Sequence, residues 1–340
     1  MLELPPVKQF VSSRGVRVYR IPFTFMPALS GRVYLVLEAG PPTLVDTGDG
    51  QDAAVRDILA GLDSVRSEFD EGVRLSDIRR FLITHGHIDH IGGLWRLREH
   101  TAAEVVVHAL DSRRIVAVQE RGVIGDKAME RFLRHAGAPP EEHPEVLDAE
   151  RRLRAHARSV PVDRTIADGQ ELDGLEIIHT PGHSPGHVCI RTGNLLITGD
   201  HVLPRTVPQT WPESIAAYLG LGHYLNSLAK IRRLSGIELA LGGHEPPLRN
   251  FYHRIDEIES SHQRRLDRLL EIIRKSPRPL TIYEMTRQMY SVQRGFHTML
   301  ALSDVGSRVE YLDQRGYLAV DNLDEIRQDD LAVYRYRAAG

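Results

Sequence analysis

The distribution of apolar and polar residues divides the chain into a strand-rich part and a helical part. Up to about residue 248, short stretches of β-branched and aromatic residues are separated by turn-forming residues, a pattern typical of strands. Helical periodicity indicates helices between them at 53–62, 92–99 and 213–234. We interpret Gly31 as the break between the first two strands. The stretches predicted as strands are residues 16–25, 32–38, 43–45, 78–83, 103–108, 166–179, 188–191, 195–198 and 238–241.

Residues 111–160 have a different character from the strand-rich segments on either side. Charged residues are dense there, apolar residues recur at helical spacing, and Pro139, Pro140 and Pro144 interrupt the segment. We therefore predict two or three helices inserted between strands.

The chain after about residue 248 is predicted to be mainly helical. A long helix at 252–275 is followed by a Pro-containing break at 276–279, helices at 282–290 and 299–314, and short strands at 317–320 and 332–336. This order of elements is the outline of a winged helix. The division therefore predicts two domains, residues 1–248 and residues 249–340.

Composition narrows the class of protein. With 340 residues and 41% apolar residues, the chain is long enough for one large domain and a small one. A single cysteine, Cys189, excludes a scaffold stapled by intrachain disulfides. The first residues do not resemble a signal peptide, and no run approaches the about 20 apolar residues that cross a bilayer. We therefore expect a cytoplasmic protein with no membrane partner.

Histidine is the residue type that points to chemistry, because 17 are present and several follow predicted strands. Four potential ligands lie within six residues, and three more follow later strands next to Gly or Pro. Imidazole and carboxylate together suit Zn(II), and also Fe(II) or Mn(II). If the strand ends meet at one rim, they would build a site for two metal ions. The seven candidates are His85, His87, Asp89, His90, His183, Asp200 and His244.

Five motifs in order resemble those of the metallo-β-lactamase superfamily. They are LVDTG with Asp46, THGHIDH at 84–90, TPGHSPGH with His183, TGD with Asp200, and GGH with His244. The resemblance covers residues 15–248 and implies an α/β fold. In this αββα sandwich, two mixed sheets pack face to face with helices outside. The C-terminal part resembles the winged-helix extension of some members.

The resemblance also implies a role for each candidate residue. The first metal would take His85, His87 and His183, the second would take Asp89, His90 and His244, and Asp200 would bridge both. Asp46 would orient the His-rich loop by hydrogen bonding. Two ions about 3.5–4 Å apart would hold a hydroxide that attacks a carbonyl carbon. Asp89 would carry the proton to the leaving atom, which makes it the candidate catalytic residue.

The substrate is narrowed further by the resemblance. β-Lactamases of the superfamily have Cys or Ser where this chain has Asp200. The motifs are most similar to those of hydroxyacylglutathione hydrolases (glyoxalase II), which favours an acyl thioester or ester as substrate. A lactonase of the acyl-homoserine lactone type is the alternative, although Leu203 stands where those enzymes carry Tyr.

The predicted insert would cap this site. Its apolar residues either line a channel for an apolar acyl chain or pack the insert's own core, and both interpretations stay open. The residues concerned are Ile115, Val118, Val123, Ile124, Met129, Phe132 and Leu133.

A third function class, nucleic-acid binding or RNA cleavage, comes from the winged-helix outline. Phosphate contacts need a basic face. Arg308 and Arg315 lie on or next to the 299–314 helix, but acidic residues surround them and dominate the predicted wing. We therefore expect the C-terminal part to pack on the catalytic domain or to form a homodimer contact. We also expect no residue after about 250 to belong to the catalytic machinery.

Overall fold

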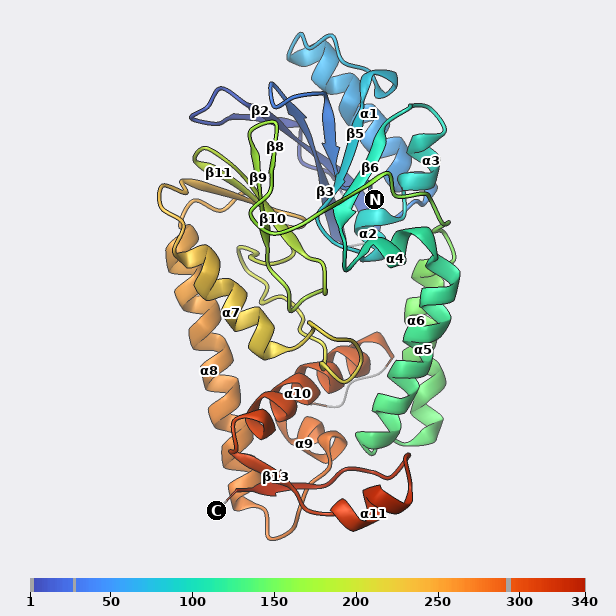
Figure 1. The fold of residues 1–340 in the computed structure, drawn as a ribbon, viewed down its shortest axis with the longest axis vertical. Coiled ribbons are helices and arrows are strands. Elements are labelled where there is room, and N and C mark those ends of the chain that lie inside the picture. Colours follow the sequence, from blue (N-terminus) through green and yellow to red (C-terminus); the bar gives the residue numbers. More distant parts are fainter. Residues whose placement is uncertain (1–2, 27–28, 292–294, 340) are drawn as a thin grey trace.

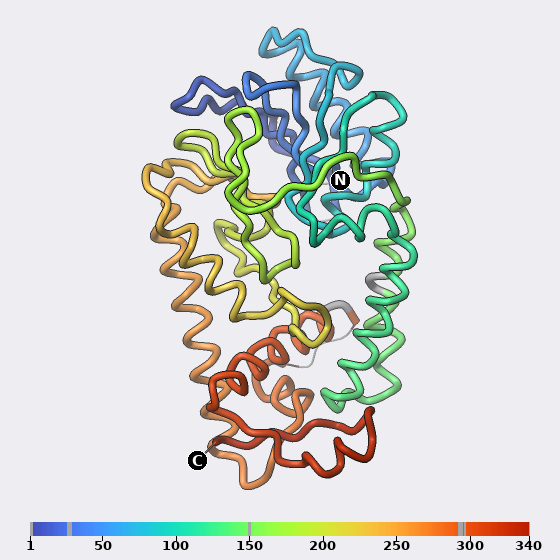
Figure 2. Tube along the Cα trace, viewed as in Figure 1, coloured from blue at the N-terminus to red at the C-terminus, as the bar shows by residue number. Residues whose placement is uncertain are grey.

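The computed structural model of the protein describes residues 3–26, 29–291 and 295–339. Its upper part in Figure 1 holds two mixed β-sheets, and Figure 2 traces the chain between them. The first sheet has the order β1-β2-β3-β4-β5-β6-β7, with antiparallel pairing from β1 to β4 and parallel pairing from β4 to β7. Its strands are β1 (Lys8–Val11), β2 (Arg17–Met26), β3 (Leu29–Leu37), β4 (Thr43–Val45), β5 (Arg80–Ile83), β6 (Glu104–His108) and β7 (Arg164–Ile166).

The second sheet has the order β12-β11-β10-β9-β8. β11 and β12 are parallel, and the other pairs are antiparallel, including the predicted hairpin of β10 and β11. Its strands are β8 (Glu171–Leu172), β9 (Leu175–His179), β10 (Val188–Thr192), β11 (Leu195–Gly199) and β12 (Leu239–Gly242).

Side chains from both sheets meet in one apolar layer, because alternate residues of a strand point to opposite faces. Val36 and Leu82 of the first sheet share this layer with Ile177 and Ile197 of the second. The opposite face of the first sheet packs against α1 (Asp52–Glu68) and α3 (Leu94–Arg98). The opposite face of the second sheet packs against α7 (Leu221–Arg232) and α8 (Phe251–Lys275). The predicted αββα sandwich is confirmed.

Two details of the strand-rich part differ from the prediction. Gly31 lies inside β3 and pairs with Phe23 of β2. A Cβ at Gly31 would lie 2.1 Å from Cζ of Phe23, so the glycine makes room for the aromatic ring and does not break the strand. The helix predicted at 213–234 begins only at Leu221, because Gly220 has a φ of 105° and residues before it form a loop.

The insert contains three helices, as predicted. They are α4 (Ser112–Val116), α5 (Val118–His135) and α6 (His143–Arg154), with a short 3-10 helix, η2 (Pro140–Glu142), between the last two. A second 3-10 helix, η1 (Leu75–Asp77), and α2 (Ile88–Ile91) lie in the first sheet's connections. In Figure 1, α5 and α6 descend from the sandwich on the side opposite α8.

The C-terminal elements lie between α8 and the α5–α6 pair, below the sandwich in Figure 1. They are α9 (Ile282–Met289), α10 (Phe296–Gln314), β13 (Leu318–Val320), α11 (Leu323–Gln328) and β14 (Tyr336–Ala338). The strand predicted at 332–336 therefore lies later, and a helix that we did not predict separates the two strands. α11 is short and polar, and it has no buried residue to give an apolar pattern.

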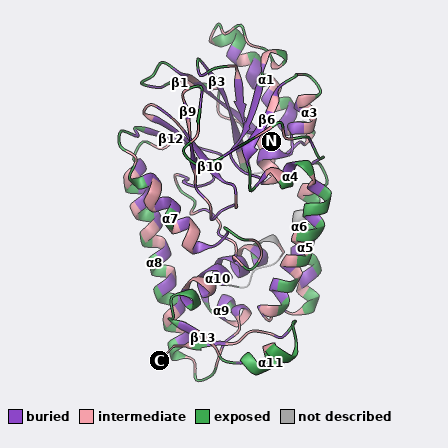
Figure 3. Ribbon diagram, in the orientation of Figure 1, coloured by how far each residue is buried: buried purple, intermediate pink, exposed green. Residues whose placement is uncertain are grey.

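The C-terminal elements share one apolar cluster with the insert and the second sheet. Phe132 of α5, Leu196 of β11, Ile258 of α8 and Val305 of α10 all belong to it. Figure 3 shows this purple interior continuing from the sandwich into α10, whereas the outer faces of α5 and α8 are green. Within the described ranges, no helix is long and apolar enough to cross a membrane.

Arg308 of α10, one of the two arginines considered above for a basic face, is fully buried. Its guanidinium lies 2.5 Å from the carboxylate of Asp304 and donates to Nδ1 of His262. Arg315 stacks on the ring of Tyr311. Arg308 therefore supports the packing of α10 against α8 and has no access to a phosphate.

Candidate metal centre

The loops that follow β5 and β9 bring together the first group of candidate ligands, His85, His87 and His183. One ligand atom from each lies within 4.8 Å of the others. Nε2 of His85 is 3.1 Å from Nδ1 of His87. His183 donates from Nδ1 to the carbonyl oxygen of Gln209 at 2.8 Å, so its Nε2 faces the group. The three residues implied for the first metal therefore share one small space.

The second group contains Asp89, His90, Asp200 and His244, and it satisfies the same 4.8 Å limit. The parallel pair β11 and β12 places Asp200 and His244 at one edge. Nε2 of His244 is 3.1 Å from Oδ2 of Asp89 and 3.4 Å from Oδ2 of Asp200. Asp200 also lies 3.8 Å from Nε2 of His183. Its carboxylate is thus between the two groups, where a bridging ligand would have to be.

Asp46 holds the His-rich loop through three hydrogen bonds. Its carboxylate accepts from the backbone N–H and the hydroxyl of Thr84, both at 2.8 Å, and from Nδ1 of His90 at 2.8 Å. The third bond leaves Nε2 of His90 pointing into the second group. These contacts are those expected of a residue that orients a ligand from behind.

The site passes a test for metal binding that does not depend on resemblance. Buried polar atoms normally have a hydrogen-bond partner. Nε2 of His90, Nε2 of His183 and Oδ1 of Asp200 are buried without one. All three belong to the two groups, and nitrogen and carboxylate donors suit divalent Zn, Fe or Mn. The clusters are therefore able to hold metal ions.

The two groups differ in their electrostatics. Burial lowers the pKa of His85 and His87 well below the ordinary value, so these imidazoles are neutral ligands. Burial also acts on His244, but nearby carboxylates, led by Asp200, outweigh it and raise its pKa to about 10. The positive charge of His90 overcomes burial at Asp89 and lowers the pKa of that carboxyl to about 2. Without metal, the second group is thus an ion-paired cluster.

Three other histidines, His187, His201 and His179, lie outside both groups. His187 hydrogen-bonds Thr180 through Nδ1 and accepts from the backbone N–H of Asp200 through Nε2. It therefore positions Asp200. His201 packs against the ring of Tyr224, and His179 stacks on His108.

Asp111 is a residue that the sequence reasoning missed. It is fully buried, and its carboxylate accepts from the backbone N–H of Gly86, the hydroxyl of Ser184 and the backbone N–H of Gly186. It thereby ties the loop of His85 and His87 to the loop of His183. Its signal in the sequence is weaker than that of Asp46, because Asp111 lies three residues after β6 whereas Asp46 directly follows β4.

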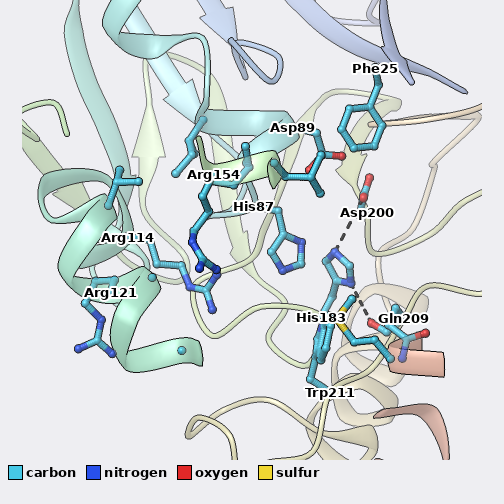
Figure 4. Close-up of a pocket in the computed structure, with 18 of the residues that line it drawn as sticks. Phe25, His87, Asp89, Arg114, Arg121, Arg154, His183, Asp200, Gln209 and Trp211 are labelled. Atoms are coloured by element: carbon cyan, nitrogen blue, oxygen red, sulfur yellow. Dashed lines mark hydrogen bonds and ion pairs between the residues drawn. The ribbon is translucent and has the colours of Figure 1, made fainter. Parts of the chain in front are cut away.

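A pocket of about 270 Å³ opens beside the two groups and is shown in Figure 4. Among the predicted insert residues, Val118 lines it, whereas Met129, Phe132 and Leu133 are buried in the shared apolar cluster. Met299 and Leu300 of α10 also line the pocket. The region after residue 250 therefore contributes to the pocket walls, although it supplies none of the candidate ligands, and its exclusion from the catalytic machinery stays a prediction. Other lining residues that were missed are Phe25, Leu29, Gln209 and Trp211.

The fold and the site agree with a comparison to known protein families. The sequence profile of the metallo-beta-lactamase superfamily matches residues 26–272. The chain therefore belongs to this superfamily, as its motifs predicted. It is a hydrolase of this superfamily, with His and Asp clusters able to bind metal ions.

Two relatives are similar to more than three quarters of this chain. The probable metallo-hydrolase YqjP of Bacillus subtilis is 24% identical over 318 residues, which are 89% of this chain and 93% of that protein. An atrochrysone carboxyl ACP thioesterase of Aspergillus fumigatus is 26% identical over 269 residues, which are 77% of this chain and 65% of that protein. At 89% of the 340 residues, the similarity to YqjP is not confined to residues 1–248.

Two solved structures have the same fold. A metallo-beta-lactamase family protein from Thermus thermophilus superposes with a TM-score of 0.73 at 24% identity, covering 94% of this chain and 98% of that one. A beta-lactamase domain protein from Burkholderia ambifaria gives a TM-score of 0.75 at 22% identity, covering 99% and 96%. The arrangement of sandwich, insert and C-terminal elements is therefore shared by these proteins.

Proposed function

We propose that this protein is a thioester or ester hydrolase that works with two divalent metal ions, most simply Zn(II). The observation that carries the proposal is that unpartnered ligand atoms of His90, His183 and Asp200 lie close together beside a pocket with an apolar wall. The two ions would lower the pKa of water from 15.7 towards about 7 and would polarise the substrate carbonyl. The residues would be distributed as the motifs implied, with Asp200 between the ions.

Residues of this chain would carry the proton and hold the metal ligands in place. In hydrolysis of a thioester, a water oxygen bonds to the carbonyl carbon, the carbon–sulfur bond breaks, and the thiol leaves with a proton. Asp89 would move that proton, because its carboxylate lines the pocket and lies beside His244 and His90. Gln209 and Asp46 act behind the ligands by fixing the rings of His183 and His90.

Two observations favour a thioester over a lactone. The similarity to an ACP thioesterase extends over 77% of the chain. The Tyr that acyl-homoserine lactonases place near the metals has no counterpart, since Leu203 is buried and the hydroxyl of Tyr224 donates to the carbonyl oxygen of His201. No tyrosine is among the residues that line the pocket within the described part of the chain.

The test combines elemental analysis with a substrate panel. Purified protein loaded with zinc is assayed against thioesters, lactones, phosphodiesters and β-lactams of comparable size. We expect two ions per chain and the highest kcat/KM for a thioester or simple ester. One ion per chain at full activity would contradict the dinuclear centre. A lactone or phosphodiester preferred by more than tenfold would overturn the substrate class.

A further inference from the structure

The pocket beside the candidate metal centre has two chemically different walls. One wall is apolar and comes from Phe25, Trp211, Met299 and Leu300. The other comes from the insert and contains three arginines, one from each helix: Arg114 of α4, Arg121 of α5 and Arg154 of α6. In Figure 4 the arginines lie on one side of His87, whereas Phe25 and Trp211 lie on the other. The proposed function assigns no task to this basic wall.

Arg114 is held close to the His-rich loop. A Cβ at Gly86 would lie 2.7 Å from Cδ of Arg114, so the glycine leaves room for the arginine's methylene groups. Gly86 stands between His85 and His87, which fixes the guanidinium of Arg114 next to the first ligand group. No carboxylate in the described residues forms an ion pair with Arg114. Its charge therefore faces the pocket without a protein counter-ion.

Arg154 crosses α5 beside Arg121. A Cβ at Gly122 would lie 2.6 Å from Nε of Arg154, so this glycine also makes room for an arginine. Arg154 is paired with Asp126 at 2.6 Å, but the same carboxylate binds Arg151 at 2.8 Å. One carboxylate is thus shared by two arginines, while Arg121 is exposed and has no ion pair within the described ranges.

The acidic residues of the pocket cannot neutralise this wall. The two that line it are Asp89 and Asp200, and both belong to the candidate ligand groups. Arg114 and Arg121 therefore bring uncompensated guanidinium groups to a partly buried pocket. Such groups make a strong site for an anion with several oxygens, because Arg offers paired donors in a planar fork.

We infer that Arg114, Arg121 and Arg154 form an anion subsite that recognises a phosphate or carboxylate on the substrate. The inference rests on the proposed hydrolase function. With the scissile carbonyl at the metal centre, the anionic end of the substrate lies against α4–α6 and its apolar end lies against α10. The pocket therefore selects a thioester or ester that is charged at one end and apolar at the other.

The test uses three thioesters with the same reactive centre. Butyryl-pantetheine is neutral, butyryl-4′-phosphopantetheine has a phosphate on the thiol side, and succinyl-pantetheine has a carboxylate on the acyl side. We expect kcat/KM of the zinc-loaded protein for one of the charged substrates to exceed that for the neutral one by at least about tenfold at low salt. The preferred charged substrate shows whether the subsite binds the thiol side or the acyl side of the substrate.

Single variants test the assignment to these arginines. Arg114→Gln and Arg121→Gln should each bring the ratio of charged to neutral kcat/KM down towards one. Arg121 is exposed on α5, so R121Q keeps the fold even if R114Q disturbs the His-rich loop. Arg113→Gln is the matched control, because Arg113 is the neighbour of Arg114 on α4 but pairs with Glu120 and does not line the pocket. A wild-type ratio near one, or a ratio unchanged in both variants, overturns the subsite.

A binding measurement separates this inference from the proposed function. Calorimetry compares S-propyl-pantetheine with its 4′-phosphate and with S-(3-carboxypropyl)-pantetheine, which are thioethers that cannot be hydrolysed. If no thioester is turned over but a charged thioether binds about tenfold tighter than the neutral one, and R121Q removes the difference, the subsite stands and the proposed function fails. If the neutral thioester is hydrolysed and charge brings no advantage, the function stands and the subsite fails.

Discussion

Two buried clusters of charged and polar side chains in this protein both contain histidine and aspartate but have opposite geometry. At the edge of the sandwich, Nε2 atoms of His90 and His183 point at a common space and find no partner. In α8–α10, Arg308 and Asp304 point at each other, and Tyr290 donates to the same carboxylate. Apart from one nitrogen each of Arg308 and His262, this second cluster satisfies itself.

This difference shows how a candidate metal-binding site can be distinguished from a network of side chains that only stabilises the fold. Both clusters are buried, and both contain a buried histidine and a buried aspartate. Burial and the charge of Arg308 lower the pKa of His262 to about 2, so that ring is neutral and accepts from Arg308. Only at the sandwich edge do several ligand atoms converge on one space. Convergence of unpartnered atoms, and not clustering of charge, is what marks the candidate metal centre.

The largest effect should come from removing a ligand of either group. His87→Ala and His244→Ala should each lower the bound metal from two ions per chain to one and reduce hydrolysis at least about 10³-fold, because one ion alone would no longer both activate the water and polarise the carbonyl. Elemental analysis and kcat measure this. His262→Gln is the matched control in the other cluster and should keep both ions. Loss of metal in H262Q, or two ions in both alanine variants, would erase the distinction between the clusters.

Breaking the second cluster, which contains Asp304, Arg308 and His262, should lower the free energy of unfolding and leave the metal content unchanged. Arg308→Gln removes the closest cation of Asp304 and should lower the free energy of unfolding by about 3 kcal/mol, since it leaves a buried carboxylate poorly compensated. Urea unfolding of the zinc-loaded protein measures it. Arg265→Gln, which removes a more exposed and more distant partner of Asp304, should cost less than about 1 kcal/mol. Equal effects of the two changes would show that Arg308 is not the main partner.

Asp89 differs from the other candidate ligands because its negative charge has a proposed role in proton transfer in addition to metal binding. Asp89→Asn keeps the size of the side chain but removes the charge and the proton acceptor. We expect kcat to fall by about 10²-fold, as is typical for the loss of an acid–base group. Metal content is measured in parallel. Wild-type kcat in a D89N protein that retains two ions would exclude Asp89 as the proton carrier.

The smallest effect should come from the pocket wall that α10 supplies. Leu300→Ala removes apolar contact while keeping the backbone carbonyl that Gln209 bonds. We expect kcat/KM for a thioester with a long acyl chain to fall by about tenfold and that for an acetyl thioester to change little. Leu323→Ala on the exposed side of α11 is the control. Identical losses for both substrates would mean that Leu300 supports the fold and does not contact the acyl chain.

The sandwich and the candidate ligands could be predicted because their signals are local. A histidine or aspartate directly after a strand, next to glycine, is visible within a few residues, and parallel strands carry such residues to one edge. The role of Asp46 followed from the resemblance to the superfamily. Asp111 does not carry the local signal, because it lies three residues after β6, between Leu110 and Ser112.

The pocket walls could not be predicted because they arise from contacts between distant segments. Gln209, Trp211 and Leu300 lie in a loop and in a helix whose sequences carry no pattern for a pocket. The same holds for Arg308, whose burial depends on the packing of α10 against α8. An arginine on a helix looks the same in a sequence whether it faces solvent or a buried carboxylate.

The shared apolar cluster has a consequence for the order in which the protein becomes active during synthesis. The last candidate ligand, His244, emerges from the ribosome well before α10, but the outer layer of the second sheet is completed only when Val305 and Val309 arrive. Until then the shared apolar cluster is incomplete. The nascent chain would therefore hold every candidate ligand before Met299 and Leu300 line the pocket, and the proposed hydrolase would lack this wall until α10 has formed.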